Sequence, residues 1–235
     1  MLFYTDLTDY IAGQRARLDA LAASKIPERG IISRVLAPGP RQDRDTDLAG
    51  YSVTHEVEAI TLDAQGVIGD RHRGLSHRST GRESSLYPRR TTIRQHRHLC
   101  IVCRHDCRVI SEKLGVEVTP ELLGANLVIE RPDGADFSLS ELPQGTHMLV
   151  IPEDAEEIPR PPIATIVHQV KQQGCGVTGN AIAERYGDRK LVRAFREHAE
   201  DNRGIICSVE YPVETSARLT AGLQIAFRFA SGVVP

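Results

Sequence analysis

The sequence lacks a long hydrophobic run. No stretch approaches the ~18 consecutive apolar residues that are needed to span a bilayer. The first residues, MLFYTDLTDYIAGQRARLDA, mix acidic and apolar side chains and lack the basic head and apolar middle of a signal peptide. We therefore expect a cytoplasmic protein without a membrane-spanning segment.

Cysteines are few and unevenly placed. The chain has five of them, an odd number that does not suit a disulfide framework, and a reducing compartment would keep them as thiols. At least one thiol is then available for chemistry. With 235 residues and 40% hydrophobic content, the chain can form one large domain or two small ones around an ordinary core.

Lysine is scarce, whereas arginine is abundant. The net charge of −2 gives no indication of nucleic-acid binding. Ten arginines lie between residues 71 and 108, where the acidic residues are only Glu83 and Asp106. Because guanidinium groups bind oxyanions, this segment is a candidate anion-binding face. The alternative is that the chain simply prefers arginine to lysine and these side chains are solvated.

Short strands dominate the hydrophobic pattern, and helices are few. Strands are expected within 30–40, 51–66, 98–103, 126–130, 162–170, 204–212 and 223–230, a turn followed by a strand within 137–152, and helices within 8–23, 104–115, 181–187 and 188–200. Residues 66–90 form a long polar segment without periodicity and are expected to be a loop. The pattern favours a mainly β fold, a closed or partly closed β-barrel (30–229) with an N-terminal helical segment (1–29) and a short tail (230–235).

The segment HRHLCIVCRHDC gathers three cysteines and three histidines and has the residue types of a zinc site. Ile101 and Val102 separate its first two cysteines, however, and such β-branched residues favour a strand, in which positions three apart point to opposite faces. Cys100 and Cys103 would then diverge, and no second pair at matching spacing completes a tetrahedral site. We predict no structural zinc here and interpret Cys107 as a core residue of the following helix.

Cys175 stands in a different setting, the segment KQQGCGVTGNAIAERYG, where glycines flank it between a predicted strand and a predicted helix. A helix that begins near 178–180 would direct backbone N–H groups and its positive end toward the sulfur. Together with a nearby arginine, this would favour the thiolate, the form that attacks sulfur or binds a soft metal. The alternative is an ordinary turn in which the cysteine is incidental.

Together these motifs resemble the MOSC domain family, named for the C-terminal domain of molybdenum cofactor sulfurases. GVIGDRHRG is similar to the family's Gly-x-x-Gly-Asp-Arg-His-x-Gly loop, and LGVEVTPELLGANLVIE to its Gly-x-x-x-x-Pro-Glu-x-Leu-Gly-x-Asn segment. GCGVTGNAIAERYG stands where the family carries its characteristic cysteine. The resemblance covers most of residues 30–229 and implies a barrel of the pyruvate-kinase type. Two positions depart from the family: Gly174, where many members have proline, and Leu223, where an acidic residue often stands.

The resemblance implies a protein that handles sulfur. A pyridoxal-phosphate cysteine desulfurase would deliver persulfide sulfur to Cys175, which would pass it to a metal-sulfur centre or to the molybdenum cofactor. Alternatively, the chain would bind the molybdenum cofactor with Cys175 as the molybdenum ligand, either as a carrier or as an oxidoreductase for N-hydroxylated compounds. A third alternative is a non-enzymatic binding module on the same fold.

The partners that the resemblance implies are a cysteine desulfurase or a molybdenum enzyme and a small anionic cofactor, but neither nucleic acid nor a membrane. Cys175 would be the nucleophile, and His72 would move a proton near neutral pH. The resemblance assigns cofactor binding to Gly69, Asp70, Arg71, Arg90, Arg94 and Asn126. The three arginines would clamp a phosphate or screen the charge of a persulfide. Asp70 would orient Arg71 or His72, and Asn126 would tie the loop to a strand through its amide.

Overall fold

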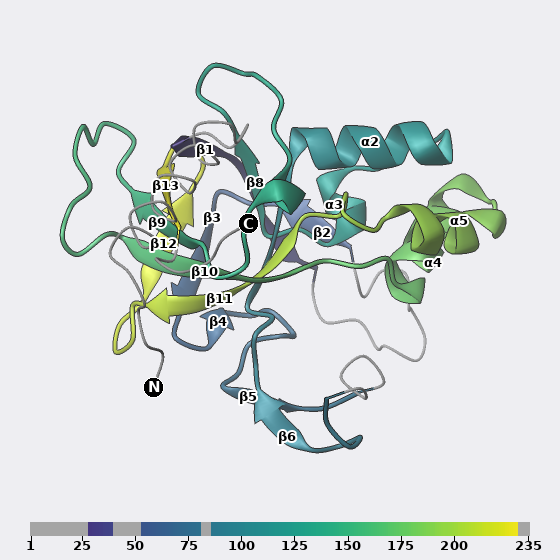
Figure 1. Ribbon diagram of the computed structural model, residues 1–235, viewed down its shortest axis with the longest axis horizontal. Helices are drawn as coiled ribbons and strands as arrows, with labels where there is room; N and C mark the ends of the chain where they lie inside the picture. Colours follow the sequence, from purple (N-terminus) through teal and green to yellow (C-terminus); the bar gives the residue numbers. More distant parts are fainter. Residues whose placement is uncertain (1–27, 40–52, 81–85, 230–235) are drawn as a thin grey trace, which may run out of the picture.

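A closed seven-stranded barrel forms the centre of the molecule (Figure 1). The computed structural model describes residues 28–39, 53–80 and 86–229. The barrel strands are β1 (Arg29–Pro38), β7 (Leu99–Cys103), β8 (Leu127–Glu130), β9 (His147–Ile151), β10 (Ala164–Lys171), β11 (Ile205–Tyr211) and β13 (Gln224–Arg228). They follow the order β13, β9, β10, β11, β7, β8, β1, and β1 pairs with β13 to close the barrel. The predicted mainly β barrel is confirmed.

Smaller sheets and helices surround the barrel. The additional strands are β2 (Thr54–Glu56), β3 (Ala59–Asp63), β4 (Gly66–Val67), β5 (Ser76–Arg78), β6 (Thr92–Arg94) and β12 (Ala217–Thr220). The helices are α2 (Arg104–Leu114), α3 (Pro120–Leu123), η3 (Leu139–Glu141), α4 (Gly176–Tyr186) and α5 (Lys190–His198). Figure 1 shows α2, α4 and α5 on one side of the barrel, and the β5–β6 hairpin projecting beside it. The helix predicted over 8–23 and the tail lie outside the described residues.

The segment 66–90, expected to be a loop, contains the short strands β4 and β5. Strands of two or three residues are too short to show an alternating pattern, and their pairing depends on partners elsewhere in the chain: β4 pairs with β3, and β5 with β6. The four-residue strand β12 was also not predicted, and it likewise pairs with a distant partner, β3, outside the barrel.

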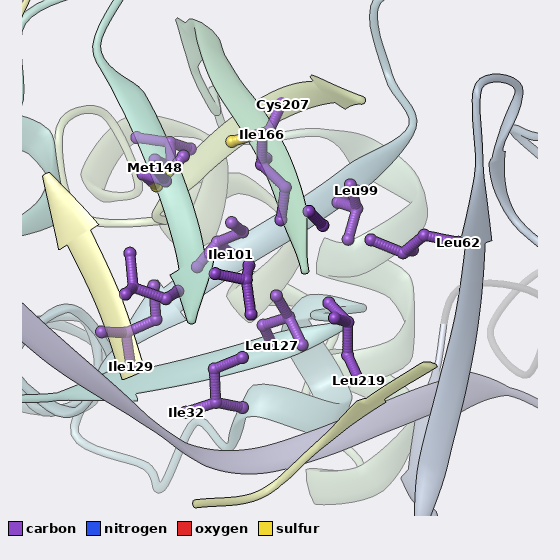
Figure 2. Packing of buried hydrophobic residues seen from close by; sticks show 14 of the residues in the cluster. Ile32, Leu62, Leu99, Ile101, Leu127, Ile129, Met148, Ile166, Cys207 and Leu219 are labelled. Carbon is purple, nitrogen blue, oxygen red and sulfur yellow. The ribbon is translucent and has the colours of Figure 1, made fainter. Parts of the chain in front are cut away.

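Strand β7 is buried on both of its faces, which explains its unbroken apolar sequence LCIVC. Leu99, Ile101 and Cys103 belong to the barrel interior, whereas Cys100 and Val102 belong to a second core that the helices cover. Figure 2 shows Leu99 and Ile101 among interior side chains from several strands. The predicted divergence of the Cys100 and Cys103 side chains is therefore confirmed.

The loop that follows β4 is fastened to the barrel by His98. Its Nε2 lies 3.2 Å from the carbonyl oxygen of Gly74, and its Nδ1 accepts a hydrogen bond of 3.1 Å from the backbone N–H of Val209. Burial lowers the pKa of His98, so the ring is neutral and can make both contacts. At the turn between β3 and β4, Gly66, the first residue of β4, has φ 114°, and a Cβ there would lie 3.1 Å from the Cβ of His98. Only glycine suits that turn.

Leu223, the second departure from the family pattern, lies just before β13. Its side chain packs against the barrel core, and its carbonyl oxygen accepts a 2.9 Å hydrogen bond from the backbone N–H of Ile32 in β1. The apolar residue thus contributes to the seam at which the barrel closes.

Within the described residues, no helix has the length and apolar character needed to cross a membrane.

Candidate functional site: a cysteine in an arginine-lined cavity

Cys175 is the N-cap residue of α4. Its backbone is extended (φ −129°, ψ 156°), and its Sγ accepts a hydrogen bond of 3.5 Å from the backbone N–H of Thr178. The thiol also lies 3.5 Å from the Thr178 hydroxyl. The helix was expected to begin near 178–180 but begins at Gly176, because the sulfur itself caps the first turn. The positive end of α4 is therefore directed at the sulfur.

Close packing of α5 fixes the loop that carries Cys175. A Cβ at Gly174 would lie 2.8 Å from the Cα of Arg196 and 2.8 Å from the carbonyl oxygen of Phe195. A Cβ at Gly179 would lie 3.1 Å from the Cα of Val192. Glycine at both positions lets α5 approach the loop and α4. The glycine at position 174 thus has a physical reason in this chain.

Arg203 lies buried behind the same loop and is 4% exposed. Its guanidinium group stacks over the ring of Phe195, with Cζ 5.4 Å from the ring centroid. Nη1 donates to the carbonyl oxygen of Gln173, and Nη2 donates to the hydroxyl oxygen of Thr178. Arg203 is therefore two contacts away from the Cys175 sulfur, through Thr178.

The loop after β4 carries Asp70 and His72. Asp70 Oδ1 accepts a 2.8 Å hydrogen bond from the backbone N–H of His72 and lies 3.3 Å from His72 Nδ1. Asn126 Nδ2 donates to Asp70 Oδ2 at 3.2 Å, while Asn126 Oδ1 accepts from the backbone N–H of Cys100 at 2.8 Å. Asn126 thus joins the loop to β7 through its amide, as expected, and Asp70 orients His72.

Burial alone shifts the pKa values of the two titratable groups of this loop in opposite directions, but both pKa values are lowered in the folded protein. Burial lowers the pKa of His72, and the hydrogen bond that His72 donates to Asp70 offsets this only in part. Burial alone would raise the pKa of Asp70, but the hydrogen bonds from His72 outweigh it and lower that pKa. At neutral pH His72 is therefore a neutral base beside an ionised carboxylate.

These side chains line one cavity of about 420 Å³ between the outer face of the barrel and the start of α4. Four arginines contribute to its walls, namely Arg71, Arg78, Arg97 and Arg203. Asp70 is the one carboxylate among the described residues that line it, and Cys175 and Cys100 supply two thiols. The cavity combines a cysteine at a helix N-terminus, a neutral histidine and an excess of guanidinium groups.

The family model of the MOSC domain matches residues 88–226. The chain belongs to the MOSC domain family. It is 32% identical over 163 residues to YuaD of Bacillus subtilis (strain 168), a protein named for metal-sulfur cluster biosynthesis, which corresponds to 68% of this chain and 77% of the relative.

Two solved structures agree with this fold. The crystal structure of the YuaD protein from Bacillus subtilis superposes with a TM-score of 0.67 at 25% identity, covering 84% of this chain and 94% of that one. The crystal structure of YiiM from Geobacillus stearothermophilus has a TM-score of 0.50 at 10% identity and covers 85% and 75% of the two chains. The second likeness concerns the fold alone.

The structure brings together most of the site residues that the MOSC resemblance suggested. Cys175, His72, Asp70, Arg71 and Asn126 all line the cavity. Gly69, Arg90 and Arg94 do not line it. Gly69 makes the turn before Asp70 with φ 89°, Arg90 is an exposed turn residue with φ 68°, and Arg94 ends β6.

The sequence did not single out three arginines of the cavity as site residues, namely Arg78, Arg97 and Arg203. Arg78 and Arg97 belong to the arginine-rich segment, but nothing in the sequence separates them from their neighbours. Arg203 precedes Gly204, whose φ is 76° and whose Cβ would lie 2.1 Å from the carbonyl oxygen of Ile101. The sequence feature that could have pointed to Arg203 is the neighbouring Gly204, a glycine that this tight turn requires.

The four remaining cysteines of the MOSC chain are buried. Burial raises the pKa of Cys100 to about 11 and of Cys107 to about 12, and it raises those of Cys103 and Cys207 as well. Cys100, which the sequence pattern placed in a strand without a functional role, lies in the cavity wall, with its Sγ 2.7 Å from the side-chain amide of Gln172. Among the five, Cys175 alone is partly exposed.

Proposed function

We propose that this protein is a sulfur carrier in which Cys175 accepts a persulfide sulfur from a pyridoxal-phosphate cysteine desulfurase. The observation that carries the proposal is the position of Cys175, the one partly exposed thiol, at the N-cap of α4 within the arginine-lined cavity. Membership of the MOSC family and the similarity to a protein named for metal-sulfur cluster biosynthesis support it. The recipient would be a metal-sulfur centre or the molybdenum cofactor.

The chemistry requires no net redox change. The Cys175 thiolate attacks the terminal sulfur of the donor persulfide, the donor's S–S bond breaks, and the donor cysteine leaves as a thiolate. Cys175 then carries a persulfide, which a nucleophilic acceptor discharges by the same exchange. Guanidinium groups and the N-terminus of α4 favour the anionic sulfur at both stages.

His72 is the base in this scheme. It lines the same cavity as Cys175, its lowered pKa keeps it neutral, and Asp70 holds its Nδ1 side. Nε2 is then the ring nitrogen that can take the thiol proton and later return it. Once the thiol has ionised, the Thr178 hydroxyl can donate to the sulfur at its distance of 3.5 Å.

The test is the mass of the intact protein after incubation with a cysteine desulfurase and free cysteine. We expect a gain of one sulfur atom that Cys175→Ser abolishes and that the matched variant Cys207→Ser, at a buried thiol of the barrel interior, retains. An unchanged mass of the wild-type protein would refute the proposal.

The same cavity supports a second candidate function, binding of the molybdenum cofactor. The partly exposed thiol of Cys175 and four guanidinium groups form a donor set that suits a soft metal and a phosphate. Cys175 would bind molybdenum, and Arg71, Arg97 and Arg203 would hold the phosphate. When bound, the cofactor would supply oxygen-transfer redox chemistry. Molybdenum and a fluorescent pterin in protein purified from a host that makes the cofactor would support this function, and metal-free protein would exclude it.

A further inference from the structure

The described cavity wall carries more positive than negative charge. Arg71, Arg78, Arg97 and Arg203 line it, and Asp70 is the one carboxylate among the described lining residues. Both Asp70 oxygens already have partners, since Oδ1 contacts His72 and Oδ2 accepts from Asn126. The wall therefore favours a ligand that carries more than one negative charge.

Two buried polar atoms of this wall have no hydrogen-bond partner among the described residues: Oγ1 of Thr54 and Nε of Arg203. Each residue is only 4% exposed. Both atoms are N–H or O–H donors, and buried donors of this kind are rarely left without an acceptor. A ligand with several acceptor oxygens would satisfy them.

The position of Arg203 is fixed before any ligand arrives. The stack on Phe195 and the hydrogen bonds to Gln173 and Thr178 hold the guanidinium group between the protein core and the Cys175 loop. An anion that engages Arg203 would lie beside the sulfur, because Thr178 contacts both groups. The cavity thus pairs an oxyanion site with a sulfur nucleophile.

We propose that the cavity binds a small oxyanion with a terminal sulfane sulfur, of which thiosulfate is the simplest, as a direct sulfur donor to Cys175. The inference rests on the proposed function, because it names a donor for the same carrier cysteine. The Cys175 thiolate attacks the outer sulfur of thiosulfate and forms the persulfide. The S–S bond of thiosulfate breaks, and sulfite leaves with the electron pair, so no further oxidant or reductant is needed.

The guanidinium groups have a specific task in this step. Negative charge moves from the attacking sulfur to the departing sulfite oxygens, and donors aimed at those oxygens stabilise the transition state more than they stabilise the free thiolate. Arg203 is then a specificity-determining residue for the oxyanion donor. Sulfur transfer from a persulfide donor that carries no oxyanion should depend on Arg203 less. This difference separates a role in donor recognition from a structural role.

The experiment compares two donors on the full chain. Wild-type protein is incubated with thiosulfate, or separately with a cysteine desulfurase and cysteine, and both the mass of the intact protein and released sulfite are measured. With thiosulfate we expect one sulfur on Cys175 and an equal amount of sulfite. Charging by the desulfurase without charging by thiosulfate would overturn this inference and leave the proposed function standing. Failure of both donors would overturn both.

Arginine variants test recognition. Arg203→Gln and Arg97→Gln should each slow charging by thiosulfate by about tenfold or more, because a charge-assisted hydrogen bond is lost. The matched control, Arg89→Gln, removes the same charge from an exposed position of the arginine-rich segment outside the cavity and should leave the rate unchanged. If Arg203→Gln lowers the midpoint temperature of thermal unfolding, the charging rate of Arg97→Gln decides the test. Equal slowing with both donors, or by Arg89→Gln, would overturn the assignment.

Discussion

The molecule contains two cysteine-bearing regions of opposite character. The segment around Cys100, Cys103 and Cys107 is rich in thiols, but it is built into two hydrophobic cores. The loop around Cys175 has a single thiol, at a helix N-terminus in an arginine-lined cavity. The comparison teaches that reactivity follows the surroundings of a sulfur atom and not the local number of sulfur atoms.

The charged groups around the thiols also differ between the two regions. Burial is the main cause that raises the pKa of Cys103 and Cys107, and the nearby Asp106 carboxylate raises both further. The Cys175 loop has Arg203 behind it and further arginines across the cavity. One region therefore opposes thiolate formation, whereas the other favours it.

The largest expected effect is the selectivity of alkylation. Iodoacetamide at neutral pH should modify Cys175 first, on the order of a thousandfold faster than the four buried thiols, which react only through local opening of the fold. Mass spectrometry of digested protein gives the modified sites, and a urea-unfolded sample in which all five react serves as the control. Early labelling of Cys100 or Cys107 would break the comparison.

The second prediction concerns the carboxylate in the thiol-rich region. Burial raises the pKa of Asp106 from its ordinary value of 3.8 to about 6. Because the folded state binds this proton more tightly than the unfolded state, the stability contributed by Asp106 is greatest below about pH 4 and is lost as the pH rises through about 6. A difference of about two pKa units corresponds to about 3 kcal/mol.

Asp106→Asn removes this titration while keeping an oxygen to accept from the backbone N–H of Cys103. Its free energy of unfolding, relative to wild type, should rise by about 2–3 kcal/mol between pH 4 and pH 7.5. Urea unfolding at the two pH values measures it. The same difference between variant and wild type at both values would show that Asp106 is not held in its neutral form.

The sequence predicted the fold and the position of Cys175 near the start of a helix, but it did not predict which side chains form the cavity. Local signals were sufficient at two places. The apolar run of β7 correctly predicted a buried strand, and the glycines on either side of Cys175 correctly predicted a turn that leads into a helix. The cavity depends on which side chains the tertiary fold brings together. Arg94 ends β6, whereas Arg97 lies beyond the turn at Gln95 and reaches the wall, and no local pattern distinguishes two arginines three positions apart.

The third prediction tests the tight packing behind the loop that carries Cys175. Gly174→Ala would place a Cβ 2.8 Å from the α5 backbone and should destabilise the protein by about 2 kcal/mol through overpacking. Gly176→Ala is the matched control, because a Cβ there meets nothing within 4 Å. Thermal unfolding measures both. Equal stability of the two variants would show that α5 does not clamp the loop.

The smallest expected effect concerns Thr178, which connects Arg203 to the sulfur. Thr178→Val keeps the shape of the side chain but removes the hydroxyl that accepts from Arg203 and contacts Cys175. The loss of one hydrogen bond, about 1 kcal/mol, should slow alkylation of Cys175 by about fivefold at neutral pH. Thr178→Ser retains the hydroxyl and should keep the wild-type rate. If the valine variant also kept that rate, the α4 backbone N–H and the cavity arginines alone would activate the thiol, and the contrast between the two regions would rest on charge and not on this contact.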